Sequence, residues 1–563
     1  MMTFSGWAPQ IADRSRWTLP ETLATRTRTH AGKRFLSVPD EAFSVTYDEM
    51  HAQATRIGGA LLSEGGKPGD RVIIMGANSS AFIQTWFGCA YAGMVEVPIN
   101  TAYIGDFLEH QVAMTAPVFA VIDAGFAERF ATCVAARATI KCFYIRSGDA
   151  GDRAEASSLL RRAGFAVAPF EGLLEGPIVE LPAVTPRDLE SILFTSGTTG
   201  PSKGVMMPHG HMHLVSEQVA AMARLTESDV YMVDAPLFHG NAQFVSTYPA
   251  LISGAEVVLH QRFSASRWLE RIRAGNVTVT NFTSVMMDFV WKQPPSERDL
   301  DNVLRCVVAI PTARSIEEEF KRRFGIDAFV EGYGLTETGS QVMTPYGMDR
   351  PVGAAGLLVD DWFEVRLADP ETGEEVPVGA VGEMLVRPKC PATFSLGYFG
   401  MPEATAHAFR DLWFHSGDAL RRDEEGWYYF VDRIKDALRR RGENISSYEI
   451  ERPIVEHPDV LECAVVGVPA EIDAGEDEVL AVVVAREGAD LCAEDVWSWC
   501  EQRVPAFAVP RYVRLVAALP KTPLEKIRKS VLREEGITAG TEDRLLAASA
   551  RDGNGARDAS HTR

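Results

Sequence analysis

Between about residues 70 and 331, short apolar runs rich in Val, Ile and Phe alternate with longer stretches that have apolar residues at helical spacing. Runs of this length and composition are typical of strands. The predicted strands are residues 71–75, 95–99, 119–123, 191–195, 255–259, 277–281, 303–310 and 327–332. Helices are expected at 207–224, 264–274 and 315–324. This alternation predicts βαβ units and parallel sheets covered by helices on both faces.

The pattern changes after about residue 352. From there to about residue 431 the apolar runs are short and interrupted by Gly and Pro, which favours a more antiparallel, barrel-like piece. Beyond Arg433 a small α+β pattern predicts strands and helices, the strands at 463–468, 479–484 and 512–515 and the helices at 447–456 and 494–504. The tail from about Gly540 has few apolar residues to bury, and we expect it to be disordered.

The sequence is most informative at residues 191–204, SILFTSGTTGPSKG. An apolar strand runs into a loop of Gly, Ser and Thr that leads to Lys203. Glycines allow backbone N–H groups to turn toward an anion, hydroxyl groups add donors, and the lysine adds a mobile cation. The spacing differs from the Walker A pattern, and a flexible linker is the alternative interpretation. A linker is not usually preceded by an apolar strand and followed by a helix, so the segment predicts a phosphate-binding loop.

Four further motifs follow this loop along the chain. They are 332–338 (GYGLTET), 413–418 (WFHSGD), 432–436 with 441–445 (DRIKD and RGENI) and 520–527 (PKTPLEKI). Together with the loop they resemble the adenylate-forming superfamily, which includes acyl-CoA synthetases, adenylation domains and beetle luciferases. The resemblance extends over about residues 20–535, and five motifs in the family's order make it specific. One departure is Glu525, which stands where the family usually has glycine.

The resemblance implies an α/β fold with a large and a small domain. The large N-terminal domain would have two parallel-type sheets and a small β-barrel-like subdomain. We expect this AMP-binding domain, with the acyl pocket and the ATP site, at residues 1–433. A small, mobile α+β C-terminal domain carrying the catalytic lysine is expected at residues 434–536, and a disordered tail at 537–563.

The first reaction of this superfamily joins a carboxylate to the α-phosphorus of ATP and expels pyrophosphate. A carboxylate has a pKa of about 4 and is ionised at pH 7, so no general base is required. The resemblance implies that ATP is bound by Thr195, Ser196, Gly197, Thr198, Thr199, Gly200, Tyr333, Gly334, Asp418 and Arg433. The expected catalytic residues are Lys203, Thr336, Glu337 and Lys526, with Glu337 as the Mg²⁺ ligand. Tyr333 would stack on adenine, Asp418 would accept the ribose hydroxyls, and Lys526 would bridge the carboxylate and the α-phosphate.

The second reaction transfers the acyl group to a thiol. The resemblance implies a hinge at Lys435 and a coenzyme A channel at Gly442 and His239. The segment PLFHGNAQ matches the acyl-pocket motif, with His239, Asn241 and Gln243 as pocket residues. This segment, RFSASRW and PKTPLEKI look most like bacterial carnitine/crotonobetaine-type CoA ligases. Asn241 and Gln243 favour a polar acid if they face the pocket, and indicate nothing about the acid if they are turned away.

The predicted function is therefore that of an ATP-dependent acyl-CoA synthetase, an acid–thiol ligase. ATP, Mg²⁺, coenzyme A and a small carboxylic acid are the implied cofactors and partners, and the resemblance also allows a homodimer. Three alternatives stay open: loading of a separate carrier protein, luciferase-like oxidation of the adenylate, and nucleotide binding without turnover.

Composition narrows the remaining possibilities. With 46% apolar and 24% charged residues the chain suits a globular protein. Its 56 basic and 77 acidic residues give a net charge of −21, which argues against nucleic acid or an anionic membrane as a partner. The first 20 residues lack the apolar region typical of a secretory signal and no apolar stretch reaches about 18 residues, so we expect neither a secretory signal nor a membrane helix. The eight cysteines form no Cys-x-x-Cys pair, so we expect a cytoplasmic protein without disulfides.

Overall fold

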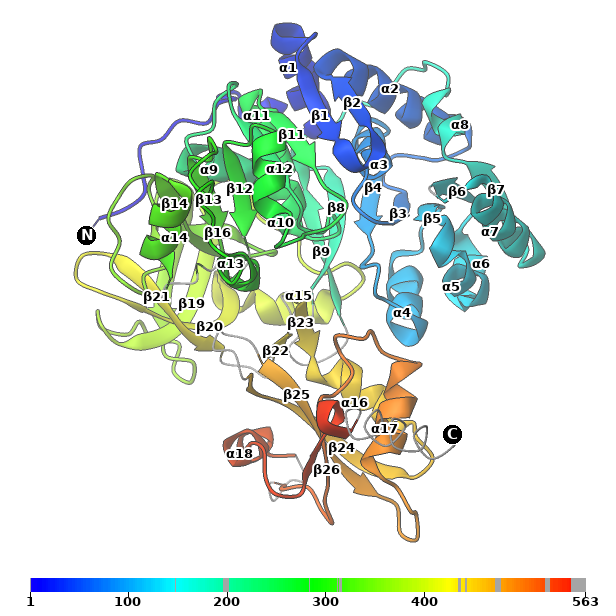
Figure 1. Cartoon of the computed structure of the whole chain (residues 1–563), viewed down its shortest axis with the longest axis vertical. Helices are drawn as coiled ribbons and strands as arrows, with labels where there is room; N and C mark the ends of the chain where they lie inside the picture. The colour runs from blue at the N-terminus through cyan, green and yellow to red at the C-terminus, as the bar shows by residue number, and fades with distance from the viewer. Residues whose placement is uncertain are drawn as a thin grey trace. The chain divides into compact units, whose positions relative to one another are not determined.

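The computed structural model in Figure 1 divides into two compact units. It describes residues 2–146, 148–195, 202–282, 284–310, 312, 316–433, 437–440, 443–470, 477–521 and 527–547. Unit 1 consists of Met1–Thr101, Gln111–Phe194 and Gly204–Ile434. Unit 2 consists of Ala102–His110, Thr195–Lys203 and Lys435–Arg563.

The helices follow the expected alternation with strands. They are α1 (Leu19–His30), α2 (Tyr47–Ser63), α3 (Ser80–Tyr91), α4 (Gly105–Thr115), α5 (Ala127–Thr132), α6 (Val134–Thr139), α7 (Ala150–Arg162), α8 (Glu171–Leu174), α9 (His209–Met222), α10 (Gly240–Ala242), α11 (Tyr248–Ser253), α12 (Trp268–Ala274), α13 (Ser284–Trp291), α14 (Glu317–Phe324), α15 (Pro402–Ala408), α16 (Ser447–Val455), α17 (Ala493–Glu501) and α18 (Lys529–Glu535). A π-helical turn, η4 (Gln243–Thr247), joins α10 to α11.

One sheet of unit 1 has seven strands in the order β14-β13-β12-β10-β11-β1-β2. The strands are β1 (Arg34–Val38), β2 (Phe43–Thr46), β10 (Val230–Val233), β11 (Glu256–Leu259), β12 (Val279–Phe282), β13 (Cys306–Ala309) and β14 (Ala328–Val330). All pairs are parallel except β1 with β2. The predicted acyl-pocket motif follows β10, so it leaves the sheet at the carboxyl ends of parallel strands, where open α/β sheets bind ligands.

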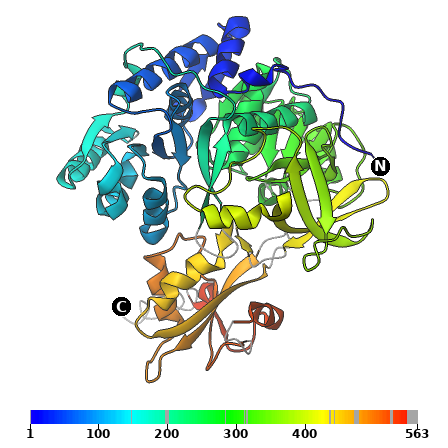
Figure 2. The same ribbon diagram turned by 180° about the vertical axis from the view of Figure 1, so that it is seen from behind.

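A second seven-stranded sheet has the order β7-β6-β5-β3-β4-β8-β9. Its strands are β3 (Arg71–Met75), β4 (Val95–Pro98), β5 (Phe119–Asp123), β6 (Cys142–Arg146), β7 (Ala166–Pro169), β8 (Leu189–Thr195) and β9 (Lys203–Pro208). The pairs from β7 to β8 are parallel. In Figures 1 and 2, helices α5 and α7 lie beside the β5–β7 end of this sheet.

The third sheet of unit 1 is antiparallel, as expected from the Gly- and Pro-interrupted pattern. Its order is β15-β16-β17-β21-β20-β19-β18. The strands are β15 (Gly332–Leu335), β16 (Gly339–Met343), β17 (Gly356–Leu358), β18 (Phe363–Ala368), β19 (Val381–Pro388), β20 (Phe414–Arg422) and β21 (Trp427–Arg433).

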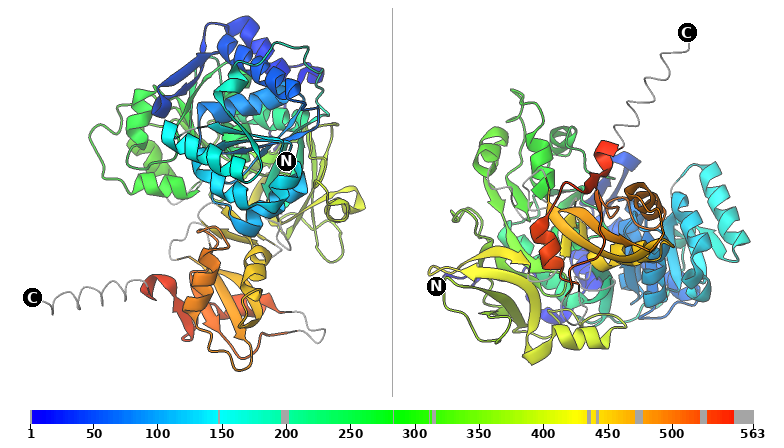
Figure 3. Two further views of the ribbon diagram at one scale, coloured as in Figure 1. Left: turned by 90° about the vertical axis from the view of Figure 1, so that its right-hand side faces the viewer. Right: turned by 90° about the horizontal axis from the view of Figure 1, so that it is seen from below.

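Unit 2 contains a four-stranded sheet and a hairpin. The sheet has the order β24-β25-β26-β27, with strands β24 (Val460–Pro469), β25 (Asp477–Ala485), β26 (Tyr512–Leu515) and β27 (Thr541–Asp543). The hairpin pairs β22 (Ala437–Arg440) with β23 (Glu443–Ser446). Because side chains alternate along a strand, Val465 and Val483 pack with α16 and α17, whereas Val466 and Val482 pack with Leu532 of α18. Figure 3 shows these helices around the sheet.

The elements begin and end where local chemistry favours it. Thr46 and Glu49 form a capping box at the start of α2. Helix α14 has three acidic residues in its first turn and three basic residues in its last, which suits the helix dipole. It ends at Gly325, whose φ of 69° lies in the left-handed region that glycine adopts at little cost.

The largest hydrophobic core surrounds α9 and α11 and includes residues of all three sheets of unit 1. Almost every residue of α9 is buried, its polar ones included. Several of these polar groups are hydrogen-bonded: Glu217, for example, accepts hydrogen bonds from the backbone N–H groups of Gln10 and Ile11 at 2.8 and 2.9 Å. The helix therefore joins the N-terminal segment to the sheets through specific hydrogen bonds as well as through packing.

The predicted fold class is confirmed, with differences in detail. Between residues 70 and 331, strands β6, β7, β9 and β10 were not predicted. The expected disorder from Gly540 is wrong for β27, which pairs with β26, and Arg511 and Asp543 form an ion pair of 3.0 Å there. Edge pairing orders this short polar segment without burying it, which hydrophobicity alone does not reveal. The predicted domain limits stay predictions.

A second core cluster of unit 1 allows a stability test. Trp268 is fully buried, with ring centroids 5.3 Å from Phe282 and from Phe324. We expect Trp268→Ala to lower the free energy of unfolding by about 3–5 kcal/mol, because the cavity cannot close around a rigid aromatic cluster. Urea unfolding followed by circular dichroism measures this. Leu300→Ala, at a side chain 63% exposed, should change stability by less than about 0.5 kcal/mol; equal losses in the two variants would contradict the expectation.

Candidate active site

The predicted nucleotide motif at 332–338 lies on β15 and the turn that leads to β16. A side chain at Gly334 would collide with the carbonyl oxygen of Gly339 across this turn, so the two backbones approach each other as closely as they do only because residue 334 is glycine. Gly334 is exposed, and Thr336 and Glu337 are half-buried. The motif therefore presents a tight, partly exposed backbone turn with a hydroxyl and a carboxylate beside it.

Tyr333 and Asp418 come from distant motifs and contact each other. The Tyr333 hydroxyl donates a hydrogen bond of 2.7 Å to Asp418 Oδ2. Asp418 is only 4% exposed, and its backbone N–H donates to Ser416 Oγ at 3.1 Å. In the β20–β21 register Asp418 lies opposite Arg433. The structure thus brings three of the predicted nucleotide-binding positions together.

Glu337 is held by a residue that the sequence analysis missed. The hydroxyl of Tyr398 donates a hydrogen bond of 2.9 Å to Glu337 Oε1. Burial, together with the negative charge of Glu337, raises the pKa of Tyr398, so this hydroxyl keeps its proton and remains a donor. Tyr398 also forms a bridge with Val205 of β9, the strand that follows the predicted phosphate loop. Backbone hydrogen bonds from Leu396 to Met206 and from Phe399 to Gly204 hold the two segments together, and no local pattern predicts this contact.

His211 of α9 supports the backbone beside Glu337. Its two ring nitrogens lie 3.0 Å from the carbonyl oxygen of Thr336 and 3.1 Å from that of Thr393. Burial lowers the pKa of His211, which favours the neutral ring. A neutral ring has one N–H, so it donates to one of these carbonyls and packs against the other. It thereby lies between the turn at Thr336 and the segment at Thr393.

Glu383 of β19 supports the segment that leads to Asp418. Its carboxylate accepts a hydrogen bond of 2.9 Å from the backbone N–H of Gly417 and lies 3.0 Å from His415 Nδ1. Glu383 is 5% exposed. It was not predicted, because a single acidic residue on a strand gives no signal of the segment across the sheet that it contacts.

The predicted acyl-pocket residues lie on a short helix and a π-turn. His239 precedes α10, and its ring is 4.6 Å from that of Phe238. The Oδ1 atom of Asn241 accepts a hydrogen bond from Asn281 Nδ2 of β12. Gln243 is fully buried, and its Nε2 donates to Glu96 Oε2 of β4 at 3.4 Å. The amides of Asn241 and Gln243 therefore lie against different sheets.

Several predicted residues cannot be placed. Thr195 ends β8 and Lys203 begins β9. Ser196, Gly197, Thr198, Thr199, Gly200, Lys435, Gly442 and Lys526 lie outside the described residues. Arg433 is placed by its backbone pairing alone.

The carboxylate of Glu337 suits a Mg²⁺ ion that is bound together with a nucleotide. Among the described residues no group of three or more His, Cys, Asp or Glu side chains could enclose a metal ion. Mg²⁺ usually takes one or two protein carboxylates and completes its shell with phosphate oxygens and water. The half-buried carboxylate of Glu337, oriented by Tyr398, fits that requirement.

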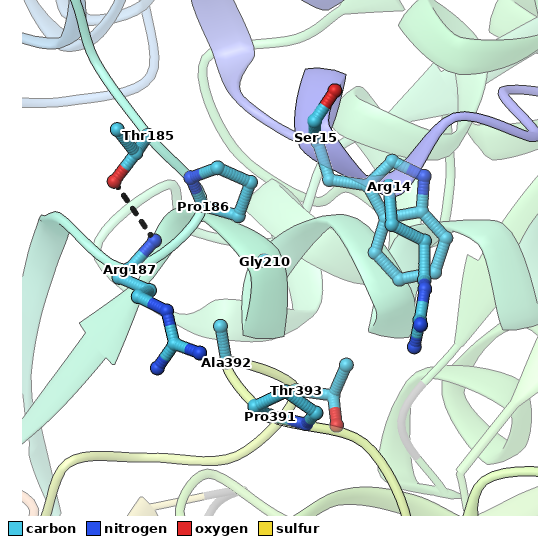
Figure 4. Close-up of a pocket in the computed structure, with 10 residues that line it drawn as sticks. Arg14, Ser15, Thr185, Pro186, Arg187, Gly210, Pro391, Ala392 and Thr393 are labelled. Atoms are coloured by element: carbon cyan, nitrogen blue, oxygen red, sulfur yellow. Dashed lines mark hydrogen bonds between the residues drawn. The ribbon is translucent and has the colours of Figure 1, made fainter.

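A cavity of about 390 Å³ lies elsewhere in unit 1 (Figure 4). Its walls include Arg14, Trp17, Arg187 and Thr393, and Gly210 of α9 contributes to them. None of the predicted site residues lines it. Thr393 connects it to the site, because the carbonyl oxygen of this residue is one of the two that His211 contacts. No helix in the described part of the chain is long and apolar enough to cross a membrane.

Family comparison identifies the class of protein. The AMP-binding enzyme family matches residues 23–399, and the AMP-binding enzyme C-terminal domain matches residues 449–526. The first match covers more than half of the 563 residues. The chain therefore belongs to the AMP-binding enzymes, which confirms the family predicted from its motifs.

Individual relatives point to CoA ligases. The chain is 34% identical over 498 residues to a feruloyl-CoA synthase of an Amycolatopsis species, covering 87% of this chain and 94% of that protein. It is 31% identical over 512 residues to a crotonobetaine/carnitine–CoA ligase of Salmonella arizonae, covering 89% and 95%. These relatives confirm the expected enzyme class, an acid–thiol ligase of the acyl-CoA synthetase type, which uses ATP and coenzyme A.

Solved structures agree on the fold. ATP-bound MatB from Rhodopseudomonas palustris superposes with a TM-score of 0.64 at 27% identity, covering 92% of this chain and 99% of that chain. An o-succinylbenzoate CoA synthetase double mutant from Bacillus subtilis gives a TM-score of 0.76 at 22% identity, covering 92% and 98%. At that lower identity the likeness concerns the fold alone.

The buried carboxylate of Asp418 generates a binding prediction. Hydrogen bonds to a charged group contribute about 1.5–3 kcal/mol, so we expect Asp418→Ala to raise the Kd for ATP roughly 10- to 150-fold. Isothermal titration calorimetry measures this. Glu425→Gln, at an exposed turn between β20 and β21, is the matched control and should bind ATP like the parent chain. Unchanged affinity in Asp418→Ala would show that Asp418 does not contact the nucleotide.

Proposed function

We propose that this enzyme activates a carboxylic acid as an acyl-adenylate and then transfers the acyl group to coenzyme A. Two hydrogen bonds carry the proposal. Tyr333 and Asp418, from two different motifs, contact each other, and Tyr398, which lies outside the motifs, holds Glu337. A buried carboxylate and a half-buried one, each oriented by a tyrosine hydroxyl, suit a ribose and a metal-bound phosphate respectively. The identities of 34% and 31% to CoA ligases support the same reaction.

In the first step a substrate carboxylate oxygen would form a bond to the α-phosphorus of ATP. The bond from that phosphorus to the bridging oxygen breaks, and pyrophosphate leaves with the electron pair. The substrate acid is already ionised, so the protein's work is to orient two anions and to compensate their charge. We assign this to Lys203, Lys526 and the Thr336 hydroxyl, and Mg²⁺ held by Glu337 would neutralise phosphate charge.

The other nucleotide positions would orient ATP. We assign phosphate contacts to the loop from Thr195 to Gly200, adenine stacking to Tyr333 beside Gly334, and ribose contacts to Asp418 and Arg433. The hydrogen bond from Tyr333 to Asp418 supports the adenine role of Tyr333 and the ribose role of Asp418. It holds the tyrosine ring and the carboxylate at a fixed distance from each other. Glu383 and His211 would not touch ATP. They would position the backbone at Gly417 and at Thr336, next to the residues that do.

In the second step the sulfur of coenzyme A would form a bond to the acyl carbon and the thiol proton would be released. The bond from that carbon to the phosphate oxygen would break, and AMP would leave with the electron pair. We assign a hinge to Lys435 and close passage of the thiol arm to Gly442, where a side chain would obstruct it. His239 would stand between this channel and an acyl pocket that includes Asn241 and Gln243. A cytoplasmic location, supported by described cysteines that are all unbridged, and a homodimer complete the proposal.

An exchange assay tests the proposed function. We expect exchange of labelled pyrophosphate into ATP that depends on a carboxylic acid, together with a CoA ester as product. The assay uses a panel of carboxylic acids. It includes ferulic acid, carnitine and crotonobetaine, after the names of the relatives, together with aliphatic and aromatic acids. No exchange across the panel would contradict the enzyme proposal in favour of nucleotide binding alone. Exchange without CoA ester formation would indicate a separate carrier protein as acceptor.

The roles of Lys526 in the two steps can be separated. We expect Lys526→Ala to slow adenylate formation by about 100- to 1,000-fold, as for loss of an electrostatic stabiliser, yet to convert supplied acyl-adenylate with coenzyme A at a near-normal rate. Single-turnover assays of each step measure this. Lys521→Ala is the control, because Lys521 Nζ lies 2.7 Å from Glu462 Oε1. Equal damage to both steps by Lys526→Ala would refute the assignment.

A further inference from the structure

The segment that follows the predicted acyl-pocket helix is wound as a π-helix. Gln243–Thr247 makes one such turn between α10 and α11. Single π-turns are rare and frequently occur at functional sites, because the extra residue changes the direction in which neighbouring side chains project. Here the turn begins at Gln243, the last residue of the pocket motif.

Hydroxyl groups take up the carbonyls that the irregular turn exposes. The four hydrogen bonds run from Ser246 Oγ to Asn241 O (3.0 Å), from Thr247 Oγ1 to Ala242 O (2.8 Å), from Ser216 Oγ to Phe244 O (3.0 Å) and from the Tyr231 hydroxyl to Val245 O (2.9 Å). Two donors come from the turn itself and two from α9 and β10. The π-turn is therefore built into the surrounding structure, since each of these four carbonyls has a hydroxyl partner.

The side chains on either side of the turn join it to two different sheets. Two residues along a helix differ by about 200° in direction, so Asn241 and Gln243 project to opposite sides. Asn241 contacts Asn281 of β12, and Gln243 contacts Glu96 of β4. Of these contact residues Glu96 is the unexpected one, because it is a fully buried acidic residue in the otherwise apolar strand Val95–Pro98.

The surroundings of Glu96 favour its uncharged form. Burial, and after it the neighbouring Glu190 carboxyl, raise the pKa of Glu96. Ser191 and Gln243 act in the opposite direction and lower this pKa. Within the described part of the chain, no hydrogen-bond partner reaches Glu96 Oε1 or Gln243 Oε1, and the Gln243 amide lies 3.4 Å from Glu96 Oε2. A neutral carboxyl and a carboxamide can exchange hydrogen bonds without a buried net charge, which makes the pair tolerable inside the fold.

We propose that Glu96 is a positioning residue for the acyl pocket: its carboxyl group holds Gln243 and thereby fixes the π-turn and the directions of His239 and Asn241. This inference rests on the proposed function, because it takes those two residues to line the pocket. Rewinding the turn as an α-helix would rotate the residues before it by about 100° relative to those after it. Glu96 therefore acts on the choice of acid through the turn and not by contact with the substrate.

Substitution at Glu96 separates this role from a general loss of stability. Glu96→Gln keeps an uncharged acceptor of the same size, and we expect the KM for the acid to stay within about threefold of the parent value. Glu96→Met removes the acceptor and leaves a buried amide unpaired; we expect the KM for the acid to rise at least tenfold, with the KM for ATP changed less than threefold. Hydrogen exchange of the backbone amides of residues 241–247 should accelerate in Glu96→Met and not in Glu96→Gln.

The matched control is Val97→Ala on the same strand. Val97 is fully buried and points to the opposite face of the sheet, so this variant should lower the unfolding midpoint without changing the KM for the acid. If Glu96→Met fails to fold, Gln243→Met removes the same hydrogen bond from the other end and should accelerate exchange at 241–247 equally.

Three results would overturn the proposal: equal damage by Glu96→Gln and Glu96→Met, unchanged exchange at 241–247 in Glu96→Met, or the same rise in KM in Val97→Ala. Failure of the proposed function gives a different result. A parent chain that activates no acid in the panel contradicts the synthetase, whereas the exchange comparison of the two Glu96 variants still tests whether Glu96 fixes the turn.

Discussion

The carboxylates of Asp418 and Glu337 must keep fixed directions although they lie on separate segments, and the arrangement of the site depends on this constraint. Tyr333 and Tyr398 meet it by donating hydrogen bonds of 2.7 and 2.9 Å. A hydroxyl fixes a carboxylate without neutralising it, whereas a lysine or arginine would cancel the charge that a metal ion requires. Each tyrosine comes from a distant part of the chain, so the site exists only when the third sheet is formed.

Supporting groups extend this principle. Glu383 fixes the backbone before Asp418, and His211 lies between the carbonyl oxygens of Thr336 and Thr393. These groups are buried, where hydrogen bonds are strong and unpaired polar atoms are costly. The chain as a whole carries a charge of −21 although ATP, the acid and coenzyme A are anions. In the proposed function, attraction would come from individual cations such as Lys203 and Lys526, which the sequence places in two separate motifs.

Sequence patterns predicted most of the parallel strands because buried strands are continuous apolar runs, as in Arg71–Met75 and Phe119–Asp123. They failed for β27, which is ordered by edge pairing and an ion pair instead of burial. The motifs selected Tyr333, Glu337 and Asp418 as candidate site residues, and Tyr333 and Asp418 are in contact in the structure. Tyr398 and Glu96 were missed, since a lone tyrosine or glutamate acquires its role only from the segment that packs against it.

The sequence by itself determined the family, the alternation of strands and helices, and the residue types that the chemistry uses, because these follow from local composition and from motifs within short stretches. The tertiary structure alone decided which of those residues meet. It paired Tyr333 with Asp418, brought Tyr398 to Glu337, and turned Gln243 toward Glu96. Such contacts join residues from 61 to 147 positions apart, and their geometry depends on packing of whole sheets and helices, which no local pattern contains.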